Sequence, residues 1–286
     1  MVGTFRGLLA VFPLVLAACS GGSIGLQNQV IPEPIVYAFP ACDSLLSVQH
    51  EFTMRGVITG DGFTGDSKNL FFADQSGRIF CLDAVTLEEI GMLHYKKSSV
   101  LFKPVISGDM ICFARFIIDE NESVVTYYDY RRSTEIVSHT VAGITLSQFE
   151  SADGVISYLT SKGRRLLFSP SGTLISDRQV AEPGAILADQ SDSIAVFIYP
   201  SGRVIVLNEG DGKVSECNPV RDASHIGVLD SKFFILGRDG TFHFYQTGAA
   251  QPVLHGTLGG RSAGMVLAGG DAWMVTYSGS VVRYSS

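Results

Sequence analysis

Apolar and polar positions recur along this chain in one order: an apolar strand, a tight turn, then a strand in which apolar and polar residues alternate. Short apolar runs and period-two alternation, bounded by turn residues, are typical of β-strands with a buried face. The order is present six times between residue 69 and the end of the sequence. The copies span residues 69–91, 110–137, 154–175, 193–216, 232–254 and 272–286.

One turn position can be aligned through all six copies, at intervals of 38 to 46 residues. Glycine occupies this position in five copies, because a tight hairpin needs a positive φ that glycine adopts at low steric cost. The second copy has serine there and a longer hairpin, Ile117–Glu122. The aligned positions are Gly77, Ser123, Gly163, Gly202, Gly240 and Gly279.

Each copy is predicted to belong to a unit of four strands, with an inner strand before it and a fourth strand after it, as at Leu87–Leu93 and Thr173–Val180. A period near 40 residues with four strands per unit is typical of β-propellers. We therefore predict an all-β domain over residues 35–286, a six-bladed β-propeller, with a β-helix or an open pair of sandwiches as alternatives. The predicted inner strands are Gly56–Thr59, Leu101–Ile106, Leu146–Glu150, Ala185–Ala188, Ile226–Leu229 and Met265–Ala268.

The sixth unit has no fourth strand before Ser286, whereas residues 46–53, LSVQHEFT, alternate ahead of the first inner strand. We expect residues 46–53 to supply the missing outer strand, so that N-terminal and C-terminal strands pair and close the ring. Closure removes exposed sheet edges that would otherwise template aggregation.

Residues 1–18 carry one positive charge, Arg6, followed by an apolar run of eleven residues. The run is shorter than the 20 or so residues that span a bilayer and has the length of a signal-peptide core. It ends Leu16-Ala17-Ala18-Cys19, which resembles the bacterial lipobox. The alternative is a plain secretory signal followed by an unrelated cysteine.

The lipobox resemblance implies that the Cys19 thiol is diacylated, that the chain is cut before Cys19, and that the new amine is usually acylated. Several acyl chains anchor a protein stably where one chain binds marginally. Ser20, in place of aspartate, resembles lipoproteins sent on to the outer membrane of Gram-negative cells. Residues 19–34 are rich in Gly, Ser, Gln and Pro, which predicts a lipidated tether holding the domain off the membrane.

The first copy resembles the repeat of the quinoprotein-like propellers, the family that includes the outer-membrane assembly lipoprotein BamB. The matching stretches are Phe71-Phe72-Ala73-Asp74 and Gly77-Arg78-Ile79-Phe80-Cys81-Leu82-Asp83-Ala84. The resemblance implies a propeller fold and a role in envelope assembly. Two features differ: residues 86–90 replace the usual Thr-Gly-x-x-x-Trp ending, and the chain has room for six blades rather than eight.

The formal net charge is −7, and removal of Arg6 with residues 1–18 leaves −8. A basic face provides most of the affinity for nucleic acid, so we predict no nucleic-acid partner. The basic pairs are interpreted as solvated turn and strand-edge charges; they are Lys96-Lys97, Arg131-Arg132 and Arg164-Arg165.

The remaining cysteines show no CxxC pattern and no zinc-site spacing with histidine. Export makes a disulfide possible, but a cysteine inside an apolar strand, such as Cys81 or Cys112, usually behaves as a small buried hydrophobe. Two alternatives stay open: all four are free thiols, or one disulfide forms, with Cys42 as one partner. The four are Cys42, Cys81, Cys112 and Cys217.

Two stretches match G-x-S-x-G, around Ser23 and Ser262. A hydrolase elbow needs a strand before the serine and a helix after it, and no helical pattern follows either one. We therefore assign neither serine a catalytic role. His225, just before the fifth inner strand, is the histidine expected to approach the propeller axis, in a structural role.

Asp61, Asp66 and Asn69 lack the alternating ligands and terminal glutamate of a calcium loop, and we interpret them as a solvated turn. Because the sequence contains no recognisable catalytic, metal-binding or cofactor-binding pattern, we predict that the protein is a membrane-tethered interaction scaffold for other envelope proteins rather than an enzyme. Exposed loops between blades, for instance around Asp61–Lys68 and Asp119–Glu122, are the expected contact regions. The alternative is an enzyme or small-molecule sensor with a site on the propeller axis, which the apolar inner strands disfavour.

Overall fold

The computed structural model describes residues 58–268 and 271–285. These residues form 24 β-strands in six antiparallel sheets, which confirms the all-β prediction. In the described ranges no helix has the length and apolar character needed to cross a membrane. The predicted signal peptide (1–18), Cys19, the tether (19–34), Cys42 and residues 46–53 lie outside the described residues.

The strands of each sheet follow one another in the sequence. The first sheet contains β1 (Ile58–Gly65), β2 (Asn69–Asp74), β3 (Arg78–Asp83) and β4 (Glu89–His94). The second contains β5 (Ser98–Val100), β6 (Val105–Ser107), β7 (Met110–Ile117), β8 (Glu122–Asp129) and β9 (Thr134–Ala142). The third contains β10 (Thr145–Glu150), β11 (Ile156–Thr160), β12 (Arg164–Phe168) and β13 (Leu174–Gln179).

The remaining three sheets continue the same order. The fourth contains β14 (Leu187–Gln190), β15 (Ile194–Ile198), β16 (Val204–Asn208) and β17 (Val214–Cys217). The fifth contains β18 (Ala223–Leu229), β19 (Lys232–Gly237), β20 (Thr241–Gln246) and β21 (Leu254–Thr257). The sixth contains β22 (Ser262–Ala268), β23 (Asp271–Thr276) and β24 (Val281–Ser285).

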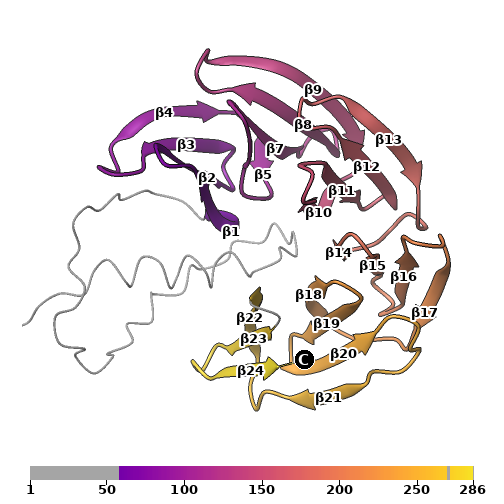
Figure 1. Cartoon of the computed structure of the whole chain (residues 1–286). Helices are drawn as coiled ribbons and strands as arrows, with labels where there is room; N and C mark the ends of the chain where they lie inside the picture. The colour runs from indigo at the N-terminus through magenta and orange to yellow at the C-terminus, as the bar shows by residue number, and fades with distance from the viewer. Residues whose placement is uncertain (1–57, 269–270, 286) are drawn as a thin grey trace, which may run out of the picture.

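The six sheets follow one another around a common centre, and the first strand of each sheet lies nearest that centre (Figure 1). The inner strands β10, β14, β18 and β22 pack against one another in sequence. Each further strand lies one step outward, so the last strand of a sheet is at the rim. This is the blade arrangement of a β-propeller.

Apolar clusters fill the seams between consecutive sheets. Phe71 of β2 packs with Phe113 of β7 across the first seam, and Tyr127 of β8 packs with Tyr158 of β11 across the second. All four side chains are fully buried. Burial of a large apolar side chain contributes about 1.5–3 kcal/mol, so the face-to-face packing of consecutive blades stabilises the fold.

Two predicted inner strands are wrong in their bounds. The run Ala185–Ala188 is only partly a strand, because β14 begins at Leu187 and continues through Asp189 and Gln190. The run Leu101–Ile106 is interrupted, with β5 before it and β6 at its end, and both strands pair with β7. Apolar composition indicates burial in both stretches but does not set the strand ends.

The other inner-strand predictions agree with the structure as far as it describes them. Leu146–Glu150, Ile226–Leu229 and Met265–Ala268 lie within β10, β18 and β22. Of Gly56–Thr59, the last two residues lie in β1 and the first two fall outside the described range.

The five aligned turn glycines all have positive φ, between 72° and 87°. The carbonyl groups of four of these glycines also have a shared role: Gly163 O accepts Val180 N at 2.9 Å and Gly240 O accepts Leu258 N at 2.9 Å. Each bond ties the chain leaving an outer strand back to the turn of the same blade. Gly77 and Gly202 accept equivalent bonds, from Tyr95 and Val220.

The alignment of Ser123 with these glycines is wrong. Ser123 is a buried residue of β8, and the hairpin of the second blade closes at Asn121, which has a φ of +52°. Asn121 O accepts Gly143 N at 3.1 Å, the same bond that the turn glycines accept. Asparagine tolerates the left-handed region better than most residues, so it replaces glycine here.

Candidate interaction surface

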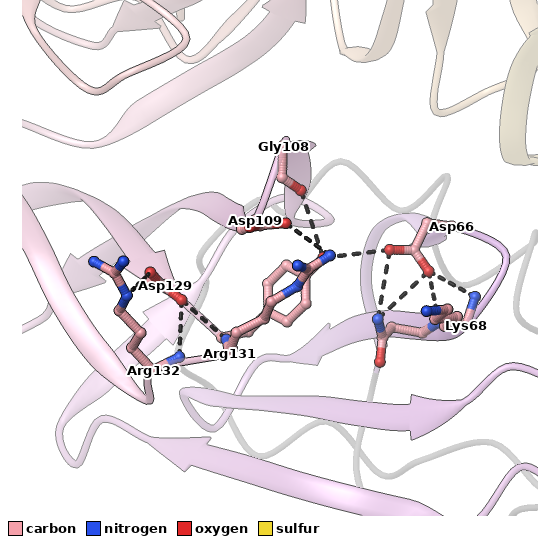
Figure 2. Close-up of polar contacts among 9 residues, drawn as sticks. Asp66, Lys68, Gly108, Asp109, Asp129, Arg131 and Arg132 are labelled. Atoms are coloured by element: carbon pink, nitrogen blue, oxygen red, sulfur yellow. Dashed lines mark hydrogen bonds and ion pairs between the residues drawn. The ribbon is translucent and has the colours of Figure 1, made fainter.

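Three loops from the first two blades converge on one face of the ring: 66–68 between β1 and β2, 108–109 between β6 and β7, and 130–133 between β8 and β9 (Figure 2). We call their polar residues the charged loop surface. It consists of Asp66, Lys68, Gly108, Asp109, Arg131 and Arg132, together with Asp129 at the end of β8 and Tyr130, which hydrogen-bonds to Asp66 and Gly108.

Asp66 organises the first loop. Its Oδ1 accepts the backbone N–H groups of Lys68 and Asn69, each at 2.7 Å. Asp66 N donates to Asn69 O at 2.9 Å and so closes the turn. The hydrogen bond from Lys68 N is the main cause that lowers the pKa of Asp66, followed by that from Asn69 N. The exposed carboxylate is therefore a fixed negative charge at neutral pH.

Tyr130 joins the two blades. Its hydroxyl donates to Asp66 Oδ2 at 3.3 Å, with Gly108 O at 3.5 Å as a second acceptor (Figure 2). Its ring packs on Phe71 with centroids 5.0 Å apart. Burial is the main cause that raises the pKa of Tyr130, and the Asp66 charge adds to it. The phenol therefore stays protonated and keeps donating.

Asp129 presents two arginines to solvent. Its Oδ1 accepts Arg131 N at 3.0 Å and Arg132 N at 2.8 Å, and its Oδ2 lies 3.6 Å from Arg132 Nε. Arg131 Nη2 also pairs with Asp109 Oδ1 at 2.8 Å. The Arg131 and Arg132 side chains are nevertheless 63% and 80% exposed. They are held in place and remain accessible.

The chemistry of this surface is recognition by charge. Exposed ion pairs contribute only about 0–1 kcal/mol to stability, so the fold does not depend on these arginines being paired internally. A planar guanidinium can bind a carboxylate through two parallel hydrogen bonds. Among the described residues no group of three or more His, Cys, Asp or Glu side chains is arranged to hold a metal ion.

The predicted turn of Asp61, Asp66 and Asn69 is shorter than expected, because Asp61 belongs to β1 and only residues 66–68 form the loop. The Asp66 carboxylate is occupied by donors: Asn69 Nδ2 lies 3.4 Å from both oxygens, in addition to the bonds above. Asp66 therefore acts as an acceptor for its own loop.

The two predicted contact regions lie on opposite faces. Both are hairpin loops inside a blade rather than connections between blades. Residues 118–121 connect β7 to β8, at the end of β7 opposite to residues 108–109. Tyr130 links residue 108 to Asp66, so the loop after Gly65 and the Asp119 loop lie at opposite ends of the blade strands.

The interpretation of the basic pairs holds for Arg131 and Arg132 and is wrong for Arg165. Arg165 is 8% exposed and forms an ion pair with Glu209 of the next blade. Its Nε donates to the buried Ser157 hydroxyl at 3.0 Å. Alternation along β12 directs Arg165 into the seam and Arg164 outward, where it pairs with Asp177 at 2.8 Å.

Two of the remaining candidates, Ser262 and His225, take part in hydrogen bonds at the contact between two blades. Ser262 is buried at the start of β22, donates to Gly237 O at 2.8 Å, and lies 3.2 Å from Ser224 Oγ. His225, on the inner strand β18, places Nδ1 2.9 Å from that same Ser224 hydroxyl. These residues form a hydrogen-bonded link between the fifth and sixth blades, and a strand rather than a helix follows Ser262. Ser23 lies outside the described residues.

The three described cysteines, Cys81, Cys112 and Cys217, are free thiols. Burial raises the pKa of Cys81 to about 11 and that of Cys112 to about 12. A thiol is reactive only as the thiolate, so these side chains behave as hydrophobic residues at neutral pH. Cys42 falls outside the described range.

Asp189 is a residue that the sequence reasoning missed. It lies on β14, and its Oδ1 accepts the buried Ser147 hydroxyl of β10 at 3.1 Å. Its Oδ2 accepts Val228 N of β18 at 2.8 Å. The inner strands are therefore more polar than predicted, and this carboxylate joins three consecutive blades. The shifted bounds of β14 hid it, since Ala185–Ala188 contains no polar side chain.

No protein-family model and no curated protein sequence matches the chain. Several solved structures have a similar fold. The computationally designed Ika8 protein has a TM-score of 0.60 and 14% identity, and the match covers 80% of this chain and 71% of that protein. BamB from Moraxella catarrhalis has a TM-score of 0.52 and 15% identity, and the match covers 81% of this chain and 86% of BamB. The structure of the RRP9 WD40 repeats has a TM-score of 0.56 and 10% identity, and the match covers 76% of this chain and 73% of the RRP9 chain. The likeness places the chain among β-propeller folds, and fold alone does not define function.

Proposed function

We propose that this protein is a membrane-anchored, periplasm-facing lipoprotein that acts as a protein-interaction scaffold in an envelope assembly or secretion complex. The observation that carries the proposal is the charged loop surface, where Asp129 holds Arg131 and Arg132 in position while their side chains stay exposed. Arginine is enriched among residues that dominate binding energy at protein interfaces.

The anchor is proposed on the lipobox-like stretch Leu16–Cys19, and outer-membrane delivery on Ser20. An acylated Cys19 would hold the ring at the membrane through the tether. The resemblance of the first repeat to the quinoprotein-like propellers, the family of an outer-membrane assembly lipoprotein, supports the envelope context.

A role without catalysis is proposed on the chemistry of the described side chains. The Cys81 and Cys112 thiols are protonated, and Ser262 is buried in a hydrogen-bonded link between blades. Both oxygens of Asp189, a carboxylate on the inner strand β14, accept hydrogen bonds from neighbouring blades. A rigid scaffold normally presents its binding residues on loops, as the charged loop surface does.

Crosslinking in mild detergent tests this proposal. We expect the wild-type protein to yield a specific crosslinked partner, and the double variant Arg131→Glu/Arg132→Glu to lose it while its circular dichroism spectrum is unchanged. Lys97→Glu is the matched control, because the Lys97 side chain is 80% exposed, like that of Arg132, and pairs with Asp119 on the opposite face. Loss of the partner in Lys97→Glu alone would assign the interaction to the other face.

A further inference from the structure

An open groove of about 460 Å³ lies at the rim of the ring, between the third and fourth blades. One wall is the segment that leaves β13, with Val180, Ala181 and Pro183; the other is formed by Ile205 of β16 and Val214 of β17. Val214 is 58% exposed although it lies in a strand. The groove is therefore an apolar surface that the described residues leave open to solvent.

The mouth of this groove carries negative charge. Arg203 pairs through Nη1 with Glu182 Oε2 at 2.7 Å and through Nε with Glu216 Oε2 at 3.0 Å. Two carboxylates thus share one guanidinium, and the site keeps one uncompensated negative charge. The Glu182 and Glu216 side chains are 69% and 52% exposed, so their second oxygens are accessible to a cation.

The strand register puts the apolar and acidic groups on the same face of β17. Ile205 pairs with Glu216, and Leu207 pairs with Val214, across the β16–β17 ladder. Val214 and Glu216 are two residues apart and therefore point to the same side of the strand. β17 is also the last strand of its sheet, so its outer edge offers backbone groups for pairing with an extended chain.

We propose that this groove binds an extended segment of a partner protein that presents an aliphatic side chain and, two residues along, a lysine or arginine. The aliphatic side chain packs against Val180, Ile205 and Val214, and the cation pairs with Glu182 and Glu216. The two-residue spacing follows from the pleat of an extended segment lying beside β17. This inference rests on the proposed scaffold function and adds a second surface to it.

The test uses the full domain and a synthetic probe, the acetylated and amidated heptapeptide Ser-Thr-Val-Thr-Lys-Thr-Ser. In an NMR titration we expect saturable shifts at the amides of Ala181, Glu182, Val214 and Glu216. Val214→Ser should abolish the shifts, whereas Val85→Ser, at a valine 70% exposed on the first blade, should leave them unchanged. Glu182→Gln/Glu216→Gln should weaken binding about fivefold, the upper end for an exposed ion pair.

Three results would overturn the proposal. The first is the absence of saturable shifts at these amides, and the second is equal binding of a peptide with glutamate in place of lysine. The third is a concentration-dependent shift at the same amides without peptide, which would show that a second copy of the chain covers the groove. None of these depends on Arg131 or Arg132, so loss of partner crosslinking in their variant is judged separately.

Discussion

Asp189 accepts the backbone N–H of Val228 at 2.8 Å, so a carboxylate of the fourth blade completes the hydrogen bonding of the fifth. Its other oxygen accepts the Ser147 hydroxyl of the third blade. Adjacent blades are otherwise held together mainly by apolar side chains, which contribute burial but little direction. The Asp189 contacts fix how three inner strands are placed relative to one another.

Replacing Asp189 tests this role. Asp189→Ala leaves the Val228 N–H and the Ser147 hydroxyl without their acceptor, so we expect a loss of about 1–3 kcal/mol in the free energy of unfolding. Asp189→Asn retains an acceptor for Val228 N and should lose less. Urea unfolding measures both, with Asp192→Ala as the control at an exposed aspartate. An Asp189→Ala variant as stable as the control would show that apolar packing alone sets the blade positions.

Gly240 and Gly248 allow two requirements for glycine, a positive φ and the lack of space for a Cβ, to be tested separately. Their φ values are +87° and +86°, but a Cβ on Gly240 would lie 1.9 Å from Gly260 O, whereas nothing lies within 4 Å of one on Gly248. Gly248→Ala should therefore cost only the left-handed backbone penalty, about 1–2 kcal/mol. Gly240→Ala should cost more, because the chain entering the sixth blade must move. Thermal unfolding compares them, and equal melting temperatures would contradict the steric argument.

The turn of the second blade closes at Asn121 rather than Ser123. We therefore expect glycine to have opposite effects on stability at these two positions. Asn121→Gly should be neutral or stabilising by up to about 1 kcal/mol, because glycine adopts the +52° φ without strain. Ser123→Gly should destabilise, because the buried Ser123 hydroxyl donates to Gly143 O and accepts Thr145 N, both at 2.9 Å. Guanidinium denaturation distinguishes them, and a stabilising Ser123→Gly would restore the original alignment.

Ring closure by residues 46–53 stays a prediction. In each of the first five blades the turn carbonyl accepts an N–H from the chain leaving the outermost strand, whereas Gly279 O accepts none from the described residues. Deleting residues 35–54 should therefore lower the melting temperature of the whole domain. Deleting residues 20–30 is the control and should leave melting unchanged, since a solvated tether contributes few contacts. Identical melting of both truncations would exclude this closure.

The anchor is tested by Cys19→Ser, which removes the acylated thiol. We expect the variant to move from the membrane fraction to soluble or unprocessed fractions. Mass spectrometry of the wild-type mature N-terminus should find acyl mass on Cys19. A mature terminus at another residue, without acyl mass, would contradict the lipobox assignment.

The sequence by itself determined the repeat and the class of fold. The positive φ at Gly163, Gly202 and Gly240 is a local requirement of a tight hairpin, so it can be recognised without knowing what surrounds the turn. The alternation along each strand likewise reports a buried and an exposed face. These local features were sufficient to predict six consecutive antiparallel sheets.

Only the tertiary structure decided where the hairpin and strand bounds of less regular blades fall. The turn of the second blade closes at Asn121 because the carbonyl of that residue, and not of Ser123, meets Gly143 N. β14 begins at Leu187 because its residues pair with β15 from that point. Both bounds depend on partners elsewhere in the chain, which composition and periodicity do not specify.

Some residues of the charged loop surface could likewise be predicted from the sequence, and others could not. Asp66 could be singled out from its loop, because an aspartate followed by backbone donors forms a local turn. Tyr130 could not, because its role arises when a loop 64 residues away places Asp66 Oδ2 beside its hydroxyl. Local backbone preferences depend on a few neighbouring residues and can therefore be predicted from the sequence. The meeting of Asp66 with Tyr130 requires the packing of two blades, which only the folded ring supplies.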